Sequence, residues 1–296
     1  MELRVMQYFL TVVREENITR AAELLHITQP TLSRQLTELE EELGERLFER
    51  GKRRTVLTDA GMRFRRRAEQ MVELAELTRQ EFGGPEPELA GVITIGSAET
   101  AAAQVFPEIM KRFCPQHPKV HFEFLSGNAD QITERLERGL IDIGLLMEPV
   151  PLDRYDFIRL PYVERWGVLM RKDDPMAERG YITAADLDGV PIITSKRAYD
   201  RGALTGWFGE EYKKLNVFVF STYNLLGNAA MLATHGLGYV AAIEGAASLY
   251  TGEHLCFRPF YPDVTCTAVL VWQKDQRFSP ATTKFLEAAK MLLKHD

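Results

Sequence analysis

A short segment rich in glycine and proline divides this chain into two parts with different sequence patterns. Residues 83–88 read Gly-Gly-Pro-Glu-Pro-Glu, a composition that ends a helix and permits a hinge. Before this segment apolar residues recur at helical spacing, and after it strand-like and helix-like patterns alternate. The length of 296 residues accommodates two or three folding units. We therefore expect an α domain, a hinge over 83–90 and an α/β domain.

The first part contains three helical patterns, of which the last two are joined by a very short turn. The first covers residues 2–16, and Asn17 is the expected N-cap of a second helix over 18–25. Thr28 is the expected N-cap of a third helix, which ends at the C-cap glycine Gly44. This order predicts a helix-turn-helix, whose last helix enters the major groove of DNA. The alternative is a three-helix packing unit whose polar face is only hydrated.

Basic residues gather directly after the third helix. Nine of them fall between Arg46 and Arg67 against two acidic residues, so this segment carries +7 although the whole chain carries −6. Phosphate binding depends on such a local patch and not on the net charge of the chain. The alternative for a run of charges is a solvated face. We interpret the run as part of a DNA-binding surface.

The same segment predicts a wing and a long helix. Residues 46–57 alternate between apolar and basic stretches, which favours two short strands with Arg53 and Arg54 at the tip between them. A helix is expected over 58–82, with an apolar stripe over 71–78. A stripe of this length needs a partner surface. We interpret the helix as a dimerisation element, and the alternative is packing against the wing.

The second part of the chain reads as a sheet covered by helices. Strands over 92–96, 120–125 and 142–147 alternate with helices, which predicts a βαβαβ unit and a mostly parallel sheet. Later strands are expected over 166–171, 191–194, 217–221 and 238–242, an edge strand over 265–272, and helices over 184–187, 207–215, 223–235 and 279–295.

Several classes of protein are excluded. No apolar run approaches the roughly 18–20 residues of a membrane span, and the N-terminus lacks the secretory signal that a transporter's solute-binding protein needs. The cysteines Cys114, Cys256 and Cys266 lie far apart, and the six histidines have no metal-ligand spacing. No nucleophile motif such as G-x-S-x-G is present. We therefore expect a cytoplasmic protein that is not an enzyme and has no catalytic residue, metal or cofactor.

Residues 21–61 carry a resemblance to a known family. The most specific matches are Ala21-Ala22-Glu23-Leu24-Leu25, Thr28-Gln29-Pro30-Thr31-Leu32-Ser33-Arg34-Gln35-Leu36, Leu39-Glu40, Leu43-Gly44, Leu47-Phe48-Glu49-Arg50 and Leu57-Thr58-Asp59-Ala60-Gly61; looser ones are Gly139-Leu140-Ile141-Asp142, Asp174-Pro175-Met176-Ala177, Asp186-Leu187 and Gly236-Leu237-Gly238. With these motifs the chain resembles a LysR-type transcriptional regulator, and the resemblance covers essentially its whole length. Ile243-Glu244-Gly245 stands where this family usually has a proline-containing segment.

The resemblance implies a fold and an assembly. It implies a winged helix-turn-helix over 1–57, a linker helix over 58–82 that dimerises, and an effector-binding domain over 91–296. This domain is expected to have two α/β lobes, like a type 2 periplasmic binding protein, with a small metabolite bound between them. The family typically forms homotetramers. The expected lobe I covers about 91–162 and 268–296, and lobe II about 163–267.

The resemblance also implies which residues bind double-stranded DNA. At the matching positions Gln29, Pro30, Ser33 and Arg34 read base edges, and short or forked hydrogen-bonding side chains suit a major groove. Other residues hold the DNA backbone or enter the minor groove from the wing: Thr28, Thr31, Arg50, Arg53 and Arg54.

Effector residues are expected where strands end, because ligands of α/β sheets bind beyond the carboxyl ends of strands. Each hydroxyl there has helix capping as the alternative role. Hydroxyls and free N–H groups suit an anion, whereas Glu99 repels one, so a cationic, amphoteric or neutral effector is favoured. The expected contacts are Ser97, Glu99, Thr100, Ser126, Gly127, Thr194, Ser195 and Asn224.

Overall fold

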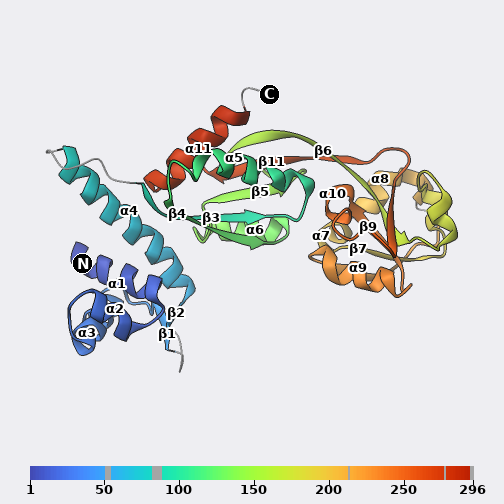
Figure 1. Cartoon of the computed structure of the whole chain (residues 1–296). Coiled ribbons are helices and arrows are strands. Elements are labelled where there is room, and N and C mark those ends of the chain that lie inside the picture. The colour runs from blue at the N-terminus through green and yellow to red at the C-terminus, as the bar shows by residue number, and fades with distance from the viewer. Residues whose placement is uncertain (51–54, 82–88, 213, 277, 294–296) are drawn as a thin grey trace.

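A computed structural model describes residues 1–50, 55–81, 89–212, 214–276 and 278–293 of the chain. A small helical domain, a long helix and two α/β lobes follow one another along an elongated molecule (Figure 1). The residues expected at the wing tip, 51–54, and in the hinge, 83–88, lie outside the described residues. No helix among the described residues is long and apolar enough to cross a membrane.

The helical domain has the predicted order of elements. Asn17 caps the second helix through the N–H groups of Thr19 and Arg20, and Thr28 caps the third, as predicted. Gly44 ends the third helix at φ 70°, a left-handed conformation that glycine adopts without strain. The elements are α1 (Leu3–Glu15), α2 (Ile18–Leu24), α3 (Gln29–Leu43), β1 (Phe48–Arg50) and β2 (Thr55–Leu57).

The wing and the linker helix α4 (Asp59–Glu81) are packed onto this domain. The two wing strands pair antiparallel, as predicted. The carboxylate of Glu40 in α3 accepts the N–H groups of Leu47 at 2.7 Å and Phe48 at 3.1 Å, which fixes the wing to the recognition helix. Phe64 of α4 packs edge-on against Phe9, so the first half of α4 belongs to the same hydrophobic core.

Lobe I is built on three parallel strands, which confirms the predicted βαβαβ unit. Its apolar core lies between the sheet and the helices α5 and α11. The strands are β3 (Ala90–Ser97), β4 (Lys119–Ser126) and β5 (Ile143–Met147), and the helices are η1 (Ala101–Gln104), α5 (Val105–Phe113), α6 (Ala129–Glu137) and α11 (Pro280–Leu293).

Lobe II repeats this plan with three further parallel strands, and it has its own core. Its strands are β7 (Pro191–Ser195), β8 (Phe218–Tyr223), β9 (Tyr239–Ile243) and the antiparallel β10 (Leu255–Pro259); its helices are η2 (Pro175–Glu178), η3 (Ala184–Leu187), α7 (Lys196–Asp200), α8 (Ala203–Tyr212), α9 (Leu226–Thr234) and α10 (Glu244–Ala247).

Two long strands join the lobes into one nine-stranded sheet of order β4-β3-β5-β11-β6-β9-β7-β8, with β10 on β6. Strand β6 (Tyr155–Arg171) runs from lobe I into lobe II, and β11 (Thr265–Gln273) returns beside it (Figure 1). The expectation of an edge strand over 265–272 is wrong. Strand β11 lies between β5 and β6, so both of its edges are paired. Leu270 on one face and Val269 and Val271 on the other are fully buried in apolar cores.

Other elements of lobe II differ from the prediction. The helix expected over 207–215 corresponds to α8, which already begins at Ala203, and the short helix α7 before it was not predicted. The helix expected over 223–235 begins at Leu226 because Tyr223 still belongs to β8. Strand β10 and helix α10 were not predicted. Strand β6 is 17 residues long, although only its last part has a strand pattern in the sequence.

Candidate functional site

The recognition helix α3 presents a polar face to solvent. Leu32, Leu36 and Leu39 are buried in the core on one side of the helix, so the opposite side is left exposed. The hydroxyls of Thr28 and Thr31 lie 2.8 Å apart and close the first turn. Ser33 is half-buried, and the remaining predicted contacts on this helix are exposed: Thr28, Gln29, Pro30, Thr31 and Arg34.

Arg34 is only loosely held in the free protein. Its Nε atom lies 3.6 Å from Oε1 of Glu38, and the two side chains are 71% and 56% exposed. An exposed ion pair of this kind contributes at most about 1 kcal/mol. The guanidinium therefore remains available to a base edge or a phosphate.

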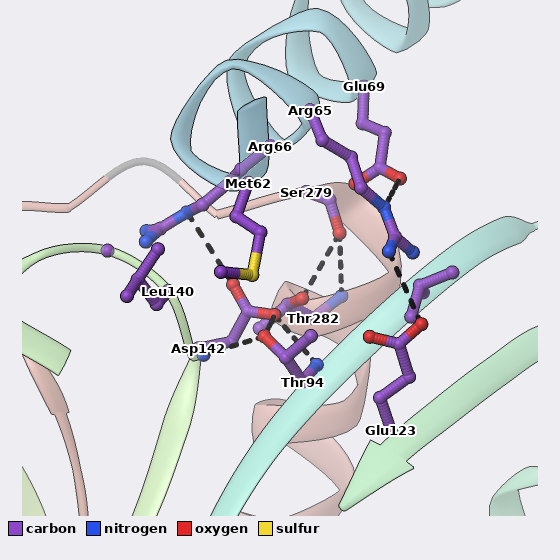
Figure 2. A pocket seen from close by; sticks show the side chains of 12 residues that line it. Met62, Arg65, Arg66, Glu69, Thr94, Glu123, Leu140, Asp142, Ser279 and Thr282 are labelled. Carbon is purple, nitrogen blue, oxygen red and sulfur yellow. Dashed lines mark hydrogen bonds and ion pairs between the residues drawn. The ribbon is translucent and has the colours of Figure 1, made fainter. Parts of the chain in front are cut away.

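The basic run does not act as one surface. Arg46, Arg63 and Arg67 are exposed, as a phosphate-binding patch requires. The side chain of Arg50 and the wing residues Arg53 and Arg54 lie outside the described residues. The interpretation of the whole run as DNA-binding is wrong for Arg65 and Arg66, which point toward lobe I and pair with acidic residues there (Figure 2).

These two arginines dock α4 onto lobe I. Nε of Arg65 lies 3.1 Å from Glu69 and Nη1 lies 3.3 Å from Glu123 of β4. Nε of Arg66 lies 3.6 Å from Asp142, whose other carboxylate oxygen accepts the N–H and hydroxyl of Thr94 (Figure 2). The contact therefore joins the DNA-binding half of the chain to the effector half through charged side chains.

The charges at this contact are partly removed from water. Burial raises the pKa of Glu69, against the opposing effect of Arg65, and burial lowers the pKa of Arg66, against that of Asp142. Burial also acts to lower the pKa of Arg65, but the carboxylates of Glu69 and Glu123 raise it overall. If one partner of such a pair is removed, the remaining group is left as an uncompensated, partly buried charge.

The two lobes enclose a cavity of about 370 Å³. Glu99 and Met147 line it from lobe I, Arg201 and Trp207 line it from lobe II, and Trp166 lies where the lobes join. The volume and the mainly apolar lining are typical of a site for a small organic ligand.

Four of the eight predicted effector contacts line this cavity: Glu99, Gly127, Ser195 and Asn224. The hydroxyl of Ser195 also caps α7, by accepting the N–H of Ala198 at 3.1 Å. The capping role is therefore observed at this residue, and its effector contact stays a prediction.

The other four lie away from the cavity. Ser97 donates to the carbonyl of Ala98 at 2.9 Å, and Ser126 lines a separate cavity of about 90 Å³. Thr194 is fully buried, and its hydroxyl has no hydrogen-bond partner among the described residues. Thr100 is buried and donates its hydroxyl to Glu164 of β6.

Glu164 is a structural residue that the sequence analysis missed. Its side chain is buried, and it accepts the N–H of Ala101 at 2.9 Å in lobe I and that of Gly245 at 2.7 Å in lobe II. A Cβ atom at position 245 would lie 2.4 Å from Oε2 of Glu164, so only glycine permits this approach. The carboxylate connects both lobes at the place where they join.

A second connection between the lobes lies beside the cavity, which Pro149, Arg197 and Arg201 line. Arg197 of α7 pairs with Asp130 of α6 and donates to the carbonyl of Pro149 at 2.9 Å. Arg201 donates to the same carbonyl at 3.2 Å. No local pattern predicts these contacts, because the partners lie 48 or more positions apart and meet only after both lobes have folded.

No chemistry beyond binding is evident from the described residues. They include no group of three or more His, Cys, Asp and Glu side chains that could hold a metal ion. Burial, together with the carboxylate of Glu164, raises the pKa of the Cys266 thiol to about 12, so this cavity-lining sulfur is protonated at neutral pH.

Comparison with known proteins identifies both halves of the chain. A family model described as LysR substrate binding domain matches residues 86–294, and one described as bacterial regulatory helix-turn-helix protein, lysR family, matches residues 3–62. The chain is 33% identical over 293 residues to the Hca operon transcriptional activator HcaR of Escherichia coli (strain K12), which covers 97% of this chain and 96% of that protein.

Solved structures share the fold. A full-length OxyR variant from Pseudomonas aeruginosa has a TM-score of 0.63 at 22% identity, over 99% of this chain and 95% of that one. Full-length CbnR in complex with its target DNA has a TM-score of 0.54 at 20% identity, over 98% of this chain and 99% of that one. At such identities the likeness concerns the arrangement of the domains and lobes alone.

Proposed function

Because this chain belongs to the LysR family of transcriptional regulators, we propose that α3 and the wing bind operator DNA under the control of a metabolite held between the lobes. The chain is a DNA-binding regulator that responds to a small-molecule effector, and it is not an enzyme. The observation that carries the assignment of α3 is its exposed polar face, opposite a leucine stripe that is fixed in the core.

The proposed DNA contacts fall into two groups. Gln29, Pro30, Ser33 and Arg34 contact base edges, because they occupy the outer side of the first half of α3. Backbone contacts come from residues flanking the helix and from the wing: Thr28, Thr31, Arg50, Arg53 and Arg54.

The proposed assembly is a homodimer or homotetramer. Met71 and Leu74 on α4 are 42% and 60% exposed, so the apolar stripe is not covered within one chain. A second α4 would cover it and place two recognition helices on one DNA duplex. We place the domain boundaries at 1–57, 58–82, 83–90 and 91–296, and the protein in the cytoplasm, where it has access to DNA.

The proposed mechanism is a population shift. An effector that contacts both lobes favours one degree of closure over another, and it changes the equilibrium by its difference in affinity for the two states. Lobe I carries α4 through Arg65 and Arg66, so a change in lobe I reaches the DNA-binding domain. The proposed effector contacts are Glu99, Gly127, Ser195 and Asn224, which line the cavity.

Selection of duplex DNA from a randomised pool by the full chain tests this function. We expect enrichment of an inverted repeat whose half-sites are about 10 base pairs apart or a multiple of that, because a dimer presents two α3 helices. The Gln29→Ala and Arg34→Ala double variant should lose the enrichment and keep weak, salt-sensitive binding to any duplex. A pool that stays random after repeated selection would contradict the proposal.

A further inference from the structure

The cavity between the lobes contains an acidic group without a partner. Glu99 lines it from lobe I, and its Oε2 atom is buried with no hydrogen-bond partner among residues the structure describes. The other carboxylate in the lining, Glu148, is compensated, because it pairs with Arg159 at 3.2 Å and accepts the hydroxyl of Thr267 at 2.5 Å. Buried polar groups generally have partners, so the orphaned oxygen of Glu99 indicates a donor that a ligand would supply.

Lobe II contributes a positive charge in excess. Arg197 and Arg201 both line the cavity, and among the described residues they share one carboxylate, that of Asp130. Arg197 is its close partner, with a side chain 16% exposed, whereas Arg201 lies 3.9 Å away and is 46% exposed. One guanidinium charge at the cavity is therefore not neutralised, and it belongs mainly to Arg201.

Three donors near the cavity that could bind a ligand carboxylate are already taken by the protein. The hydroxyl of Thr100 and the N–H of Ala101, which lie at the end of the first strand, are already taken by Glu164. The N–H of Gly245 on the opposite lobe is taken by the same carboxylate. The protein thus fills this set of anion-binding groups with its own acid, and Arg201 remains as the cationic contact.

The rest of the lining suits an apolar body. The rings of Trp166 and Trp207 lie 4.5 Å apart between their centroids, and both line the cavity together with Met147. A volume of about 370 Å³ is sufficient for a molecule of the size of an amino acid.

From these charges we infer that the effector is a zwitterionic amino acid with an apolar or aromatic side chain. Its ammonium group binds Glu99, its carboxylate binds Arg201, and its side chain packs against Trp166 and Trp207. The inference rests on the proposed function, because it takes the cavity between the lobes as the effector site. It goes beyond that proposal by naming the ligand class.

Three probes that share one phenylethyl skeleton test the inference by calorimetric titration of the full chain. L-phenylalanine carries both charges, 3-phenylpropionate lacks the ammonium group and 2-phenylethylamine lacks the carboxylate. A charge-assisted hydrogen bond commonly changes affinity by about tenfold or more. We expect L-phenylalanine, or another apolar amino acid among leucine, methionine and tryptophan, to bind at least about tenfold tighter than its two single-charge analogues.

Two variants assign the contacts. Glu99→Gln should weaken binding of the amino acid and of the amine by about tenfold. Binding of the carboxylate analogue should be unchanged or tighter. Arg201→Gln should weaken binding of the amino acid and of the carboxylate analogue, and it should leave binding of the amine unchanged. Glu134→Gln and Arg154→Gln change exposed charges of the same kind outside the cavity, and they should have no effect.

Three outcomes overturn the inference. These are tighter binding of the carboxylate analogue than of the amino acid, tighter binding of the amine than of the amino acid, and no binding of any apolar amino acid at millimolar concentration. Selection of operator DNA by the same protein distinguishes a failure of this inference from a failure of the proposed function. If DNA is selected and the amino acids fail, only the ligand class is wrong; if no DNA sequence is selected, the proposed function itself fails.

Discussion

At the scale of single residues, Arg34 is the side chain whose removal best separates reading of DNA sequence from binding to phosphate. It is 71% exposed on α3, and its weak pairing with Glu38 leaves it free to contact a base. Arg34→Ala should lower affinity for a selected operator by about tenfold to a hundredfold, since a bidentate base contact is worth about 1–3 kcal/mol. Fluorescence anisotropy on the operator and on a shuffled duplex measures both affinities.

The comparison between the two duplexes decides the role of Arg34. A smaller loss on shuffled DNA than on the operator is expected for base reading. An equal loss on both makes Arg34 a phosphate contact. Arg154→Ala is the matched control, because Arg154 is 79% exposed and lies in the effector domain.

Thr100 illustrates how a polar residue near a cavity can serve the fold. Its hydroxyl is one of three donors that hold the buried carboxylate of Glu164. Thr100→Val should lower the free energy of unfolding by about 1–3 kcal/mol, because a buried charged acceptor loses a donor. Thr100→Ser keeps the hydroxyl and should unfold in urea close to the unmodified chain. A Thr100→Val protein of unchanged stability but lost ligand binding would make Thr100 an effector contact instead.

The Cys266 thiol should be inert although it lines the cavity. Burial raises its pKa to about 12, and the thiolate is the reactive form, so at pH 8 only about one molecule in ten thousand is reactive. Iodoacetamide at pH 8 should therefore leave Cys266 of the folded chain unmodified, as read by peptide mass mapping. Labelling in guanidinium is the control, in which Cys266 should react. Rapid modification in the folded state would mean that the thiol is exposed to water.

At the scale of elements, the junction between the wing and α4 depends on Gly61. A Cβ atom at this position would lie 2.0 Å from the carbonyl oxygen of Leu47 and 2.8 Å from Cδ2 of Leu57. Gly61→Ala should therefore push α4 away from the wing and lower the unfolding free energy by about 1–3 kcal/mol or more. The midpoint of thermal unfolding and operator affinity should both fall.

Gly180→Ala is the control for this substitution. Nothing lies within 4 Å of a Cβ atom at position 180, so the same change there should leave stability and operator binding nearly unaltered. Gly61→Ala protein with unchanged stability would mean that α4 is not held against Leu47 as described.

Among the helices and strands, those fixed by local signals could be predicted from the sequence, and those fixed by distant partners could not. The caps Asn17, Thr28 and Gly44 act within a few residues, so the sequence locates the helices of the DNA-binding domain correctly. The place of β11 in the sheet depends instead on β5 and β6, which are far away in the chain. Alternation within residues 265–272 carries no information on which strands flank it, and the prediction of an edge strand was wrong for that reason.

Within the site, the same distinction holds. Strand ends are readable from the sequence, and they locate Glu99 and Ser195 at the cavity. The bridges from Arg197 to Asp130 and from Thr100 to Glu164 require the relative placement of two lobes, which no local pattern contains. The interpretation of the basic run was wrong for Arg65 and Arg66 for the same reason, because the sequence shows their charge but not the direction in which their side chains point.

At the scale of the whole molecule, the contact between α4 and lobe I is where the two halves of the regulator can influence each other. Arg65 lies between Glu69 of its own helix and Glu123 of lobe I, with a side chain only 18% exposed. Arg65→Glu would place three acidic side chains together, and it would remove the cation that Glu69 and Glu123 share in the unmodified chain. Breaking the largely buried pair with Glu69 costs about 3–5 kcal/mol, and the new carboxylate also repels Glu123 across the contact, which favours release of α4 from lobe I.

Small-angle X-ray scattering of the free protein checks this release, because a DNA-binding domain freed from lobe I increases the radius of gyration. Arg67→Glu is the matched control: it makes the same charge change two residues away, but Arg67 is exposed and donates to Gln70 on its own helix. We expect the larger radius for Arg65→Glu only. If both variants keep the original radius, the ion pairs do not hold α4 in place, and the effector signal must reach the DNA by another route, such as the contacts between subunits.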